Sequence, residues 1–105
     1  MSEWVKVGKY DEFEAGYPVY HDFEYETAVL FRVGDEILAI EDRCSHDDNP
    51  LGDGVLDGCQ IVCPRHGARF DIRTGKALTM PAVEDVSAYQ VKIEDGDVFI
   101  LAPEE

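Results

Sequence analysis

Basic residues are scarce in this sequence of 105 residues, where nine lysines and arginines stand against 23 aspartates and glutamates, for a formal net charge of −14. A nucleic-acid backbone or an anionic membrane surface needs a basic footprint on its protein partner, so the composition argues against both. The same negative field would steer the chain toward a basic patch on another protein. Solubility alone would also account for the acidity.

Cysteine is scarce as well, and its number is odd. Three cysteines do not resemble the even, dense set that staples a secreted domain. No apolar run approaches the length of a membrane span. The first residues, Met1 to Trp4, lack the basic and apolar character of a signal region. We therefore expect a reducing, cytoplasmic setting.

A helical hydrophobic period is also missing, and no internal repeat or low-complexity tract takes its place. Short β-prone runs are present instead. They lie at residues 3–10, 17–23, 27–33, 36–40, 60–62, 87–93 and 98–101. Gly34-Asp35 and Asp95-Gly96 each separate two such runs, which predicts two β-hairpins. The length suits one domain and not two. We predict an all-β fold, a small antiparallel β-sandwich or barrel spanning residues 1–105.

Residues 43–81 differ in composition from the rest of the chain. They are rich in Gly, Asp, Asn and Pro and contain few long apolar runs. This is the composition of loops and short strands, and loops on a rigid scaffold often carry the chemistry of a protein. We expect a basal β part, residues 1–42 and 82–105, with an inserted loop-rich lobe at 43–81 that carries the site.

Two pairs of metal-ligand residues lie in that lobe. Cys44 and His46 form a Cys-x-His pair, Cys63 and His66 form a Cys-x-x-His pair, and sixteen residues separate the pairs. Two centres suit this set. One is a structural Zn²⁺, and the other is a [2Fe–2S] cluster with two Cys on one iron and two His on the other. Zinc modules usually supply their His pair from one helix, and no helical pattern is present, so the two-iron centre is favoured.

The two pairs, together with Gly67, the run from Ala68 to Asp71 and Thr74-Gly75, resemble the Rieske [2Fe–2S] family and its soluble ferredoxin branch. The resemblance is close over residues 40–81. It implies a cluster-binding lobe in which two residues hold each iron and a further residue lies in a third loop covering the cluster. The residues are Cys44 and Cys63 on one iron, His46 and His66 through Nδ1 on the other, and Pro81 in the covering loop.

The same resemblance implies a function. Members of the ferredoxin branch are cytoplasmic one-electron carriers with one [2Fe–2S] cluster per chain. They accept electrons from a flavin-dependent ferredoxin reductase and pass them to the terminal oxygenase of a ring-hydroxylating dioxygenase system. The sequence contains no nucleophile–base pair, no nucleotide loop and no second domain for a mononuclear iron site, so the chain is expected to be an electron-transfer protein and not an enzyme.

The sequence departs from the quinol-oxidising branch of that family at four positions. Where that branch has two further cysteines that form a disulfide, this chain has Asn49 and Arg65. Where that branch has a Ser and a Tyr that donate hydroxyl hydrogen bonds to sulfur, this chain has Ala68 and Phe70, which have no donor. Fewer donors to sulfur favour a low reduction potential.

Two alternatives remain open. The chain could be a small Rieske subunit of another complex, such as a nitrite reductase, or a Zn²⁺-stapled interaction module. Of the other candidate residues, Cys59 is interpreted as a buried small hydrophobe and His21 as a surface imidazole. The basic cluster is interpreted either as a mixed solvated surface or as a docking face. Its residues are Arg65, Arg69, Arg73 and Lys76.

Overall fold

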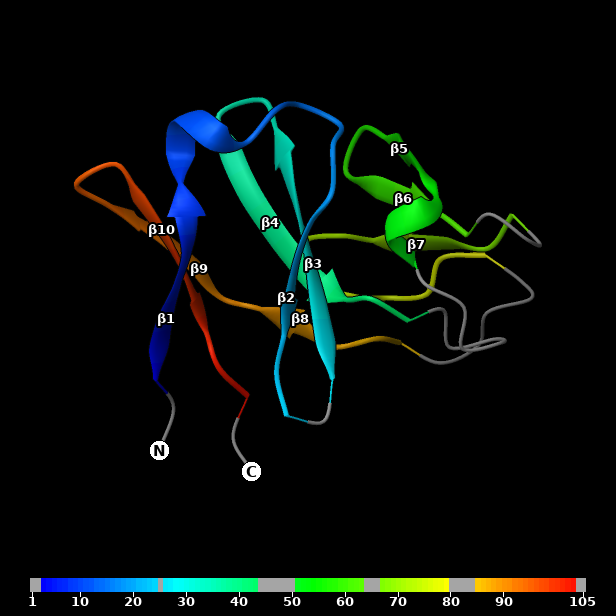
Figure 1. Ribbon diagram of the computed structural model, residues 1–105. Helices are drawn as coiled ribbons and strands as arrows, with labels where there is room; N and C mark the ends of the chain where they lie inside the picture. Colours follow the sequence, from blue (N-terminus) through cyan, green and yellow to red (C-terminus); the bar gives the residue numbers. More distant parts are fainter. Residues whose placement is uncertain (1–2, 25, 44–50, 64–66, 80–84, 104–105) are drawn as a thin grey trace.

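The computed structural model describes residues 3–24, 26–43, 51–63, 67–79 and 85–103 (Figure 1). Its strands are β1 (Trp4–Lys9), β2 (Val19–Asp22), β3 (Thr27–Val33), β4 (Glu36–Glu41), β5 (Val55–Asp57), β6 (Gln60–Val62), β7 (Arg69–Asp71), β8 (Ala88–Tyr89), β9 (Val91–Glu94) and β10 (Asp97–Leu101). Two 3-10 turns, η1 (Tyr10–Glu12) and η2 (Leu51–Asp53), are the helical elements of the described residues. In that part of the chain, no helix has the length and apolar character needed to cross a bilayer. The predicted all-β class is confirmed.

The strands form three antiparallel sheets, with the orders β1-β10-β9, β2-β3-β4-β8 and β5-β6-β7. The third sheet lies wholly within residues 43–81 and stands with η2 at one end of the molecule (Figure 1). The run at 87–93, expected as one strand, is divided at Gln90, because β8 pairs with β4 while β9 pairs with β10. The Gln90 carbonyl accepts a hydrogen bond from the Leu101 N–H (2.9 Å), so the chain passes between sheets at this residue.

Both predicted hairpins are present. Val33 faces Glu36, so Gly34 and Asp35 form the two-residue loop between β3 and β4. In the β9–β10 hairpin, Asp95 and Gly96 form the loop with φ values of 52° and 80°. Two consecutive positive φ angles are the requirement of a type I′ turn, whose twist matches that of the strands it joins.

Strand β3 is buried on both faces, and it divides the core into two clusters. The first cluster joins β3 and β4 to the third sheet and consists of Val29, Phe31, Ile40, Leu51, Ile61, Cys63, Ala68, Phe70, Ile72 and Val86. The second fills the space next to the β1-β10-β9 sheet and consists of Phe13, Ala28, Leu30, Ile37, Ala39, Val98 and Ile100. Successive residues of a strand point to opposite faces, so alternate residues of β3 serve different clusters. This explains why β3 has an uninterrupted apolar run.

Close backbone contacts fix the third sheet and its connections in place. A Cβ atom added to Gly75 would lie 1.9 Å from the Val86 carbonyl oxygen, and one added to Gly54 would lie 2.0 Å from that of Val62. The Val86 N–H also donates a hydrogen bond to the Gly75 carbonyl (2.8 Å). Only glycine permits backbones to approach so closely at these two positions.

We predict that Gly75→Ala destabilises the protein much more than Gly58→Ala. Both glycines have a left-handed φ, 78° and 62°, which costs alanine about 1–2 kcal/mol. Only at Gly75 does the added methyl group also meet a backbone carbonyl, because nothing lies within 4 Å of the corresponding point at Gly58. This overpacking should add about 1–3 kcal/mol. Chemical unfolding followed by circular dichroism measures the difference, and equal losses in the two variants would contradict the contact.

Candidate metal centre

Of the four predicted ligands, Cys63 is the one that lies among the described residues. Cys44, His46, His66 and Pro81 lie outside the described residues. Cys63 directly follows β6, carries a free thiol and is 1% exposed. Its N–H donates to the Ala68 carbonyl (2.7 Å), and its own carbonyl accepts from the Gly67 N–H (3.1 Å). The two ends of the Cys-x-x-His segment are therefore tied together by backbone hydrogen bonds.

The segment that contains Cys44 and His46 has its described ends in the same region. Asp42 precedes it, and Leu51 follows it as the first residue of η2. The Asp42 Oδ1 accepts a hydrogen bond from the Gly52 N–H (2.7 Å) across the base of this segment. The Leu51 side chain is fully buried in the cluster that also holds Cys63. The bases of the two ligand-bearing segments thus meet in one apolar cluster.

The described residues on either side of a third segment, residues 80–84, are also held by hydrogen bonds. Thr79 before it accepts a hydrogen bond at Oγ1 from the Arg69 N–H (3.0 Å). Asp85 after it accepts one at Oδ1 from the Ala77 N–H (2.8 Å), and Val86 lies in the cluster with Cys63. The structure therefore places the bases of three connecting segments together, as expected for loops that share one centre.

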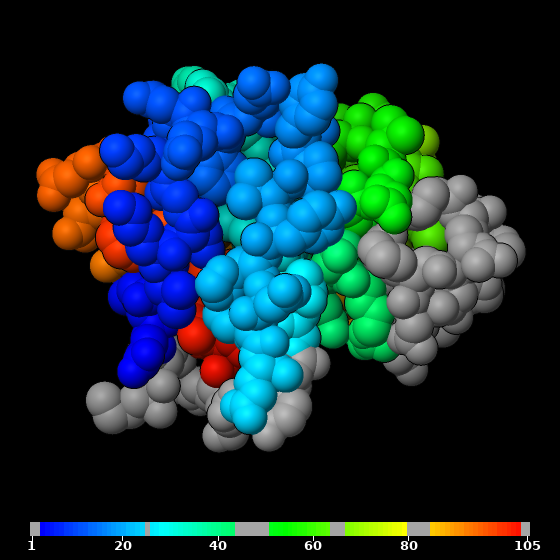
Figure 2. Space-filling view, in the orientation of Figure 1, coloured from blue at the N-terminus to red at the C-terminus, as the bar shows by residue number. Residues whose placement is uncertain are grey.

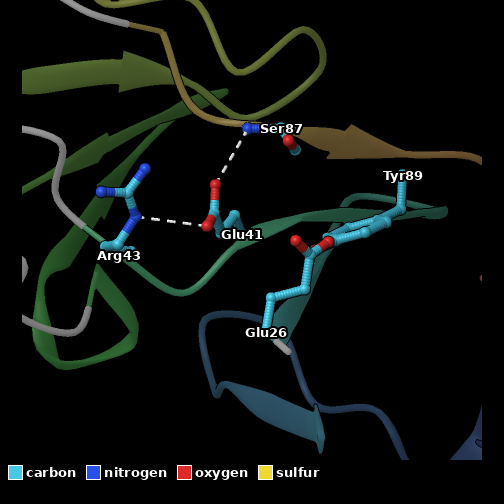
Figure 3. Close-up of polar contacts among 5 residues, drawn as sticks. All are labelled: Glu26, Glu41, Arg43, Ser87 and Tyr89. Atoms are coloured by element: carbon cyan, nitrogen blue, oxygen red, sulfur yellow. Dashed lines mark hydrogen bonds and ion pairs between the residues drawn. The ribbon is translucent and has the colours of Figure 1, made fainter. Parts of the chain in front are cut away.

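Carboxylates surround these bases. The Glu41 carboxylate is 3.2 Å from the Arg43 Nε (Figure 3). Burial raises the pKa of Asp42, and the nearby Asp53 charge acts in the same direction, while backbone N–H groups oppose the rise. Burial and the charges of Asp42 and Asp53 also raise the pKa of Tyr20, whose ring lies against Gly52. The face with β2 and the adjoining η2–β5 segment is shown in Figure 2.

The described residues fit an iron–sulfur centre at Cys63. A cluster ligand must be a thiolate that is not consumed in a disulfide, and the Cys63 thiol is free. Ala68 and Phe70 belong to the same buried cluster as Cys63, and neither side chain has a hydrogen-bonding group, so the surroundings of Cys63 are apolar and shielded from water. Within the described ranges, no group of three or more His, Cys, Asp and Glu side chains could hold a metal ion elsewhere.

Cys59 is not the buried residue that the sequence suggested. It lies in the β5–β6 hairpin turn and is half-buried, because it is outside the paired strand residues whose side chains enter the core. The Arg73 guanidinium lies beside the thiol, and the Glu36 carboxylate followed by Cys59 raises the pKa of Arg73. His21 is also half-buried and packs edge-on against Phe23, with 4.8 Å between ring centroids.

Two residues of the basic cluster are engaged within the chain. Arg69 pairs with Asp57 (2.9 Å) and also donates to the Gln60 side chain. Arg73 makes a two-pronged pair with Glu36. These contacts support the interpretation of a mixed solvated surface over that of a positive docking face.

Known proteins share this sequence and fold. The model of the Rieske [2Fe–2S] domain matches residues 3–90. The 3-phenylpropionate/cinnamic acid dioxygenase ferredoxin subunit of Shigella flexneri serotype 5b (strain 8401) is 49% identical over 76 residues, 71% of this chain and 72% of that protein. The ferredoxin component of the 2,4-dinitrotoluene dioxygenase system of Burkholderia sp. (strain RASC) is 39% identical over 101 residues, 95% of this chain and 97% of that protein.

A solved complex of reduced oxygenase and oxidized ferredoxin in carbazole 1,9a-dioxygenase contains a chain of the same fold, with a TM-score of 0.90 and 29% identity. The match covers 97% of this chain and 95% of that one.

We predict that the purified protein is brown and carries two irons and two labile sulfides, and that Cys63→Ala and His46→Ala abolish its visible spectrum. The reason is that each variant removes one of the four expected ligands, and a [2Fe–2S] centre needs four. Cys59→Ala is the matched control, since it removes a free thiol outside the pattern and should leave the spectrum unchanged. Iron and sulfide analysis, together with absorption spectra of wild type and the three variants, tests the prediction. Stoichiometric zinc in a colourless protein would establish the zinc alternative.

Proposed function

This chain belongs to the Rieske [2Fe–2S] domain family, and from that membership we propose that it is the ferredoxin of a ring-hydroxylating dioxygenase system. In this role it is a one-electron carrier between a flavin-dependent ferredoxin reductase and a terminal oxygenase. The observation that carries the proposal is the family match over residues 3–90, which includes both Cys/His pairs. The convergence of their bases on the cluster around Cys63 supports it.

The relatives support the oxygenase partner. The dinitrotoluene ferredoxin component is matched over 97% of its length, so the two chains are of similar extent. The solved carbazole 1,9a-dioxygenase complex pairs a ferredoxin with its oxygenase. The reductase partner and the cytoplasmic setting are parts of the same proposal, and they rest on the sequence resemblance and on the composition.

In the proposed centre, Cys44 and Cys63 would hold one iron, and His46 and His66 would hold the other through Nδ1. The cluster, when bound, supplies reversible one-electron chemistry. Two neutral imidazoles in place of two thiolates give the ligand set two fewer negative charges, which makes the addition of an electron easier than with four cysteines. The burial of Cys63 at 1% exposure keeps water from its sulfur, and the short hydrogen-bonded loop base fixes its backbone.

The proposed division into a basal part and an inserted lobe is supported by one sheet, and the two parts share a core. The β5-β6-β7 sheet lies within residues 43–81. Its buried residues, Ile61 and Phe70 among them, share the first cluster with Val29 and Phe31 of β3. The described residues of the lobe therefore pack against the basal part through one common core, which suits a carrier whose site must be supported by the fold.

We predict that the bimolecular rate of electron transfer to the oxygenase falls as salt concentration rises. The net charge of −14 favours a partner surface of opposite sign, and exposed charges are screened beyond about 10 Å at 0.1 M salt. Stopped-flow mixing of the reduced protein with oxidised oxygenase over a series of salt concentrations measures this. A bimolecular rate that does not depend on ionic strength would show that electrostatic steering does not contribute to the encounter.

We also predict a reduction potential near the low end of the range for the class, roughly −150 mV rather than +300 mV. Ala68 and Phe70 are fully buried in the cluster that holds Cys63, and neither side chain can donate a hydrogen bond to sulfur. An Ala68→Ser/Phe70→Tyr variant should therefore have a higher potential. Ala28→Ser is the control, because Ala28 is equally buried but lies in the second cluster.

Protein-film voltammetry measures all three proteins. A wild-type potential well above zero would show that hydroxyl donors do not set the potential here, as would a double variant that shifts no more than the control.

A further inference from the structure

Two consecutive carboxylates, Glu41 and Asp42, stand where β4 ends and the first ligand-bearing segment begins. Successive residues at the end of a strand point to opposite sides, so the two side chains reach different parts of the molecule. Each side chain contacts a segment that borders the proposed centre, as the following distances show.

Glu41 connects the start of the first segment to the end of the third. Its Oε2 is 3.2 Å from the Nε of Arg43, the residue before Cys44, and its Oε1 accepts a hydrogen bond from the Ser87 N–H at 3.4 Å. The Glu41 N–H donates to the Ser87 carbonyl (2.8 Å). The side chain is 15% exposed, and Figure 3 shows its carboxylate between Arg43 and the Ser87 backbone.

Asp42 closes the base of the first segment from the other side. Its Oδ1 accepts the Gly52 N–H at 2.7 Å, and its carboxylate also interacts with the backbone of Leu51. Its own N–H donates to the Thr27 carbonyl (2.8 Å), which fixes its backbone to β3. The carboxylate therefore bridges the two described ends of the segment that contains Cys44 and His46.

The contacts of the Glu41 and Asp42 carboxylates should contribute to the stability of the segments they join. A partly buried carboxylate is unfavourable unless donors compensate for the lost water, and a backbone N–H left without its acceptor carries a similar cost. For Asp42 the donors come from η2, directly after the first segment, and for Glu41 they come from Arg43 and Ser87. Loss of either carboxylate therefore acts first on the segments around the proposed centre.

We propose that Glu41 and Asp42 are positioning residues that hold the ligand-bearing segments in the arrangement the [2Fe–2S] cluster requires. This rests on the proposed function, since it presumes the cluster. Asp42 fixes the two ends of the first segment relative to each other, and Glu41 fixes the start of that segment against Ser87, the residue before β8. As two negative charges at this base, they also oppose the addition of an electron and lower the reduction potential.

Four variants separate the acceptor role from the charge. Asp42→Asn keeps an oxygen that can accept the Gly52 N–H but removes the charge, while Asp42→Ala removes both. Glu41→Gln keeps an acceptor for Ser87 and removes the ion pair with Arg43. Glu36→Gln is the matched control, because Glu36 is at the other end of the same strand and also pairs with an arginine, Arg73.

The experiment measures two properties of each cluster-loaded protein: the rate at which an iron chelator removes the visible spectrum, and the reduction potential. Asp42→Ala should lose its cluster about fivefold faster than wild type, the ratio expected for one typical hydrogen bond. Asp42→Asn should lose it at the wild-type rate but show a higher potential. Glu41→Gln should show both faster loss and a higher potential, and Glu36→Gln should show neither.

The inference is overturned if Glu41→Gln and Asp42→Ala lose their clusters no faster than Glu36→Gln, whatever their potentials, or if Asp42→Asn loses its cluster as fast as Asp42→Ala. The proposed function stands in those cases, because wild type still carries the cluster. A wild-type protein without iron and sulfide would instead refute the proposed function. If Asp42→Ala does not fold, the rate of cluster loss from Glu41→Gln compared with Glu36→Gln still decides, because that rate reports positioning whereas the potential reports charge.

Discussion

Strand β3 has no solvent-facing side along its central residues, and each of its faces supports a different part of the molecule. Ala28 and Leu30 pack toward the β1-β10-β9 sheet, while Val29 and Phe31 pack toward the third sheet and Cys63. The position of the candidate ligand is therefore set by the same strand that holds the basal sheets together. A substitution in the buried part of β3 therefore affects both the stability of the fold and the packing around Cys63.

The sequence was sufficient for those features that depend on neighbouring residues. Asp95-Gly96 predicts a two-residue turn because both positions accept positive φ, and the paired Cys and His spacing predicts a metal centre. Features that depend on distant partners were not predictable. The division at Gln90 arises because β8 and β9 pair with different strands, and no local pattern specifies those partners. Cys59 was expected to be buried because cysteine usually is, whereas its place in the β5–β6 hairpin turn leaves it only half-buried.

The sequence could suggest the ligand residues of the candidate site, but not the side chains that hold the surrounding segments in place. Cys63 followed from the motif, whereas the contacts of Glu41 and Asp42 join residues up to 46 positions apart and leave no periodic signal. The one available clue was their place, two acidic residues between an apolar strand and a cysteine. For the basic cluster, the sequence left a mixed surface and a docking face open, and it could not name the partners Asp57 of Arg69 and Glu36 of Arg73, which favour the mixed surface.

The pairing of β4 with β8 has a consequence for how such a molecule can be altered. Ala39 faces Tyr89 and Ile40 faces Ala88, so the chain leaves the basal sheet and returns to it on adjacent antiparallel strands. In topological terms, the residues between Glu41 and Ser87 are one long connection between two adjacent antiparallel strands, β4 and β8. The entropy of closing such a connection grows only slowly with its length. The basal sheets can therefore accept a connection of another length between β4 and β8. Such a segment is best joined at Glu41 and Ser87. Its side chains must also complete the core around Val29 and Phe31.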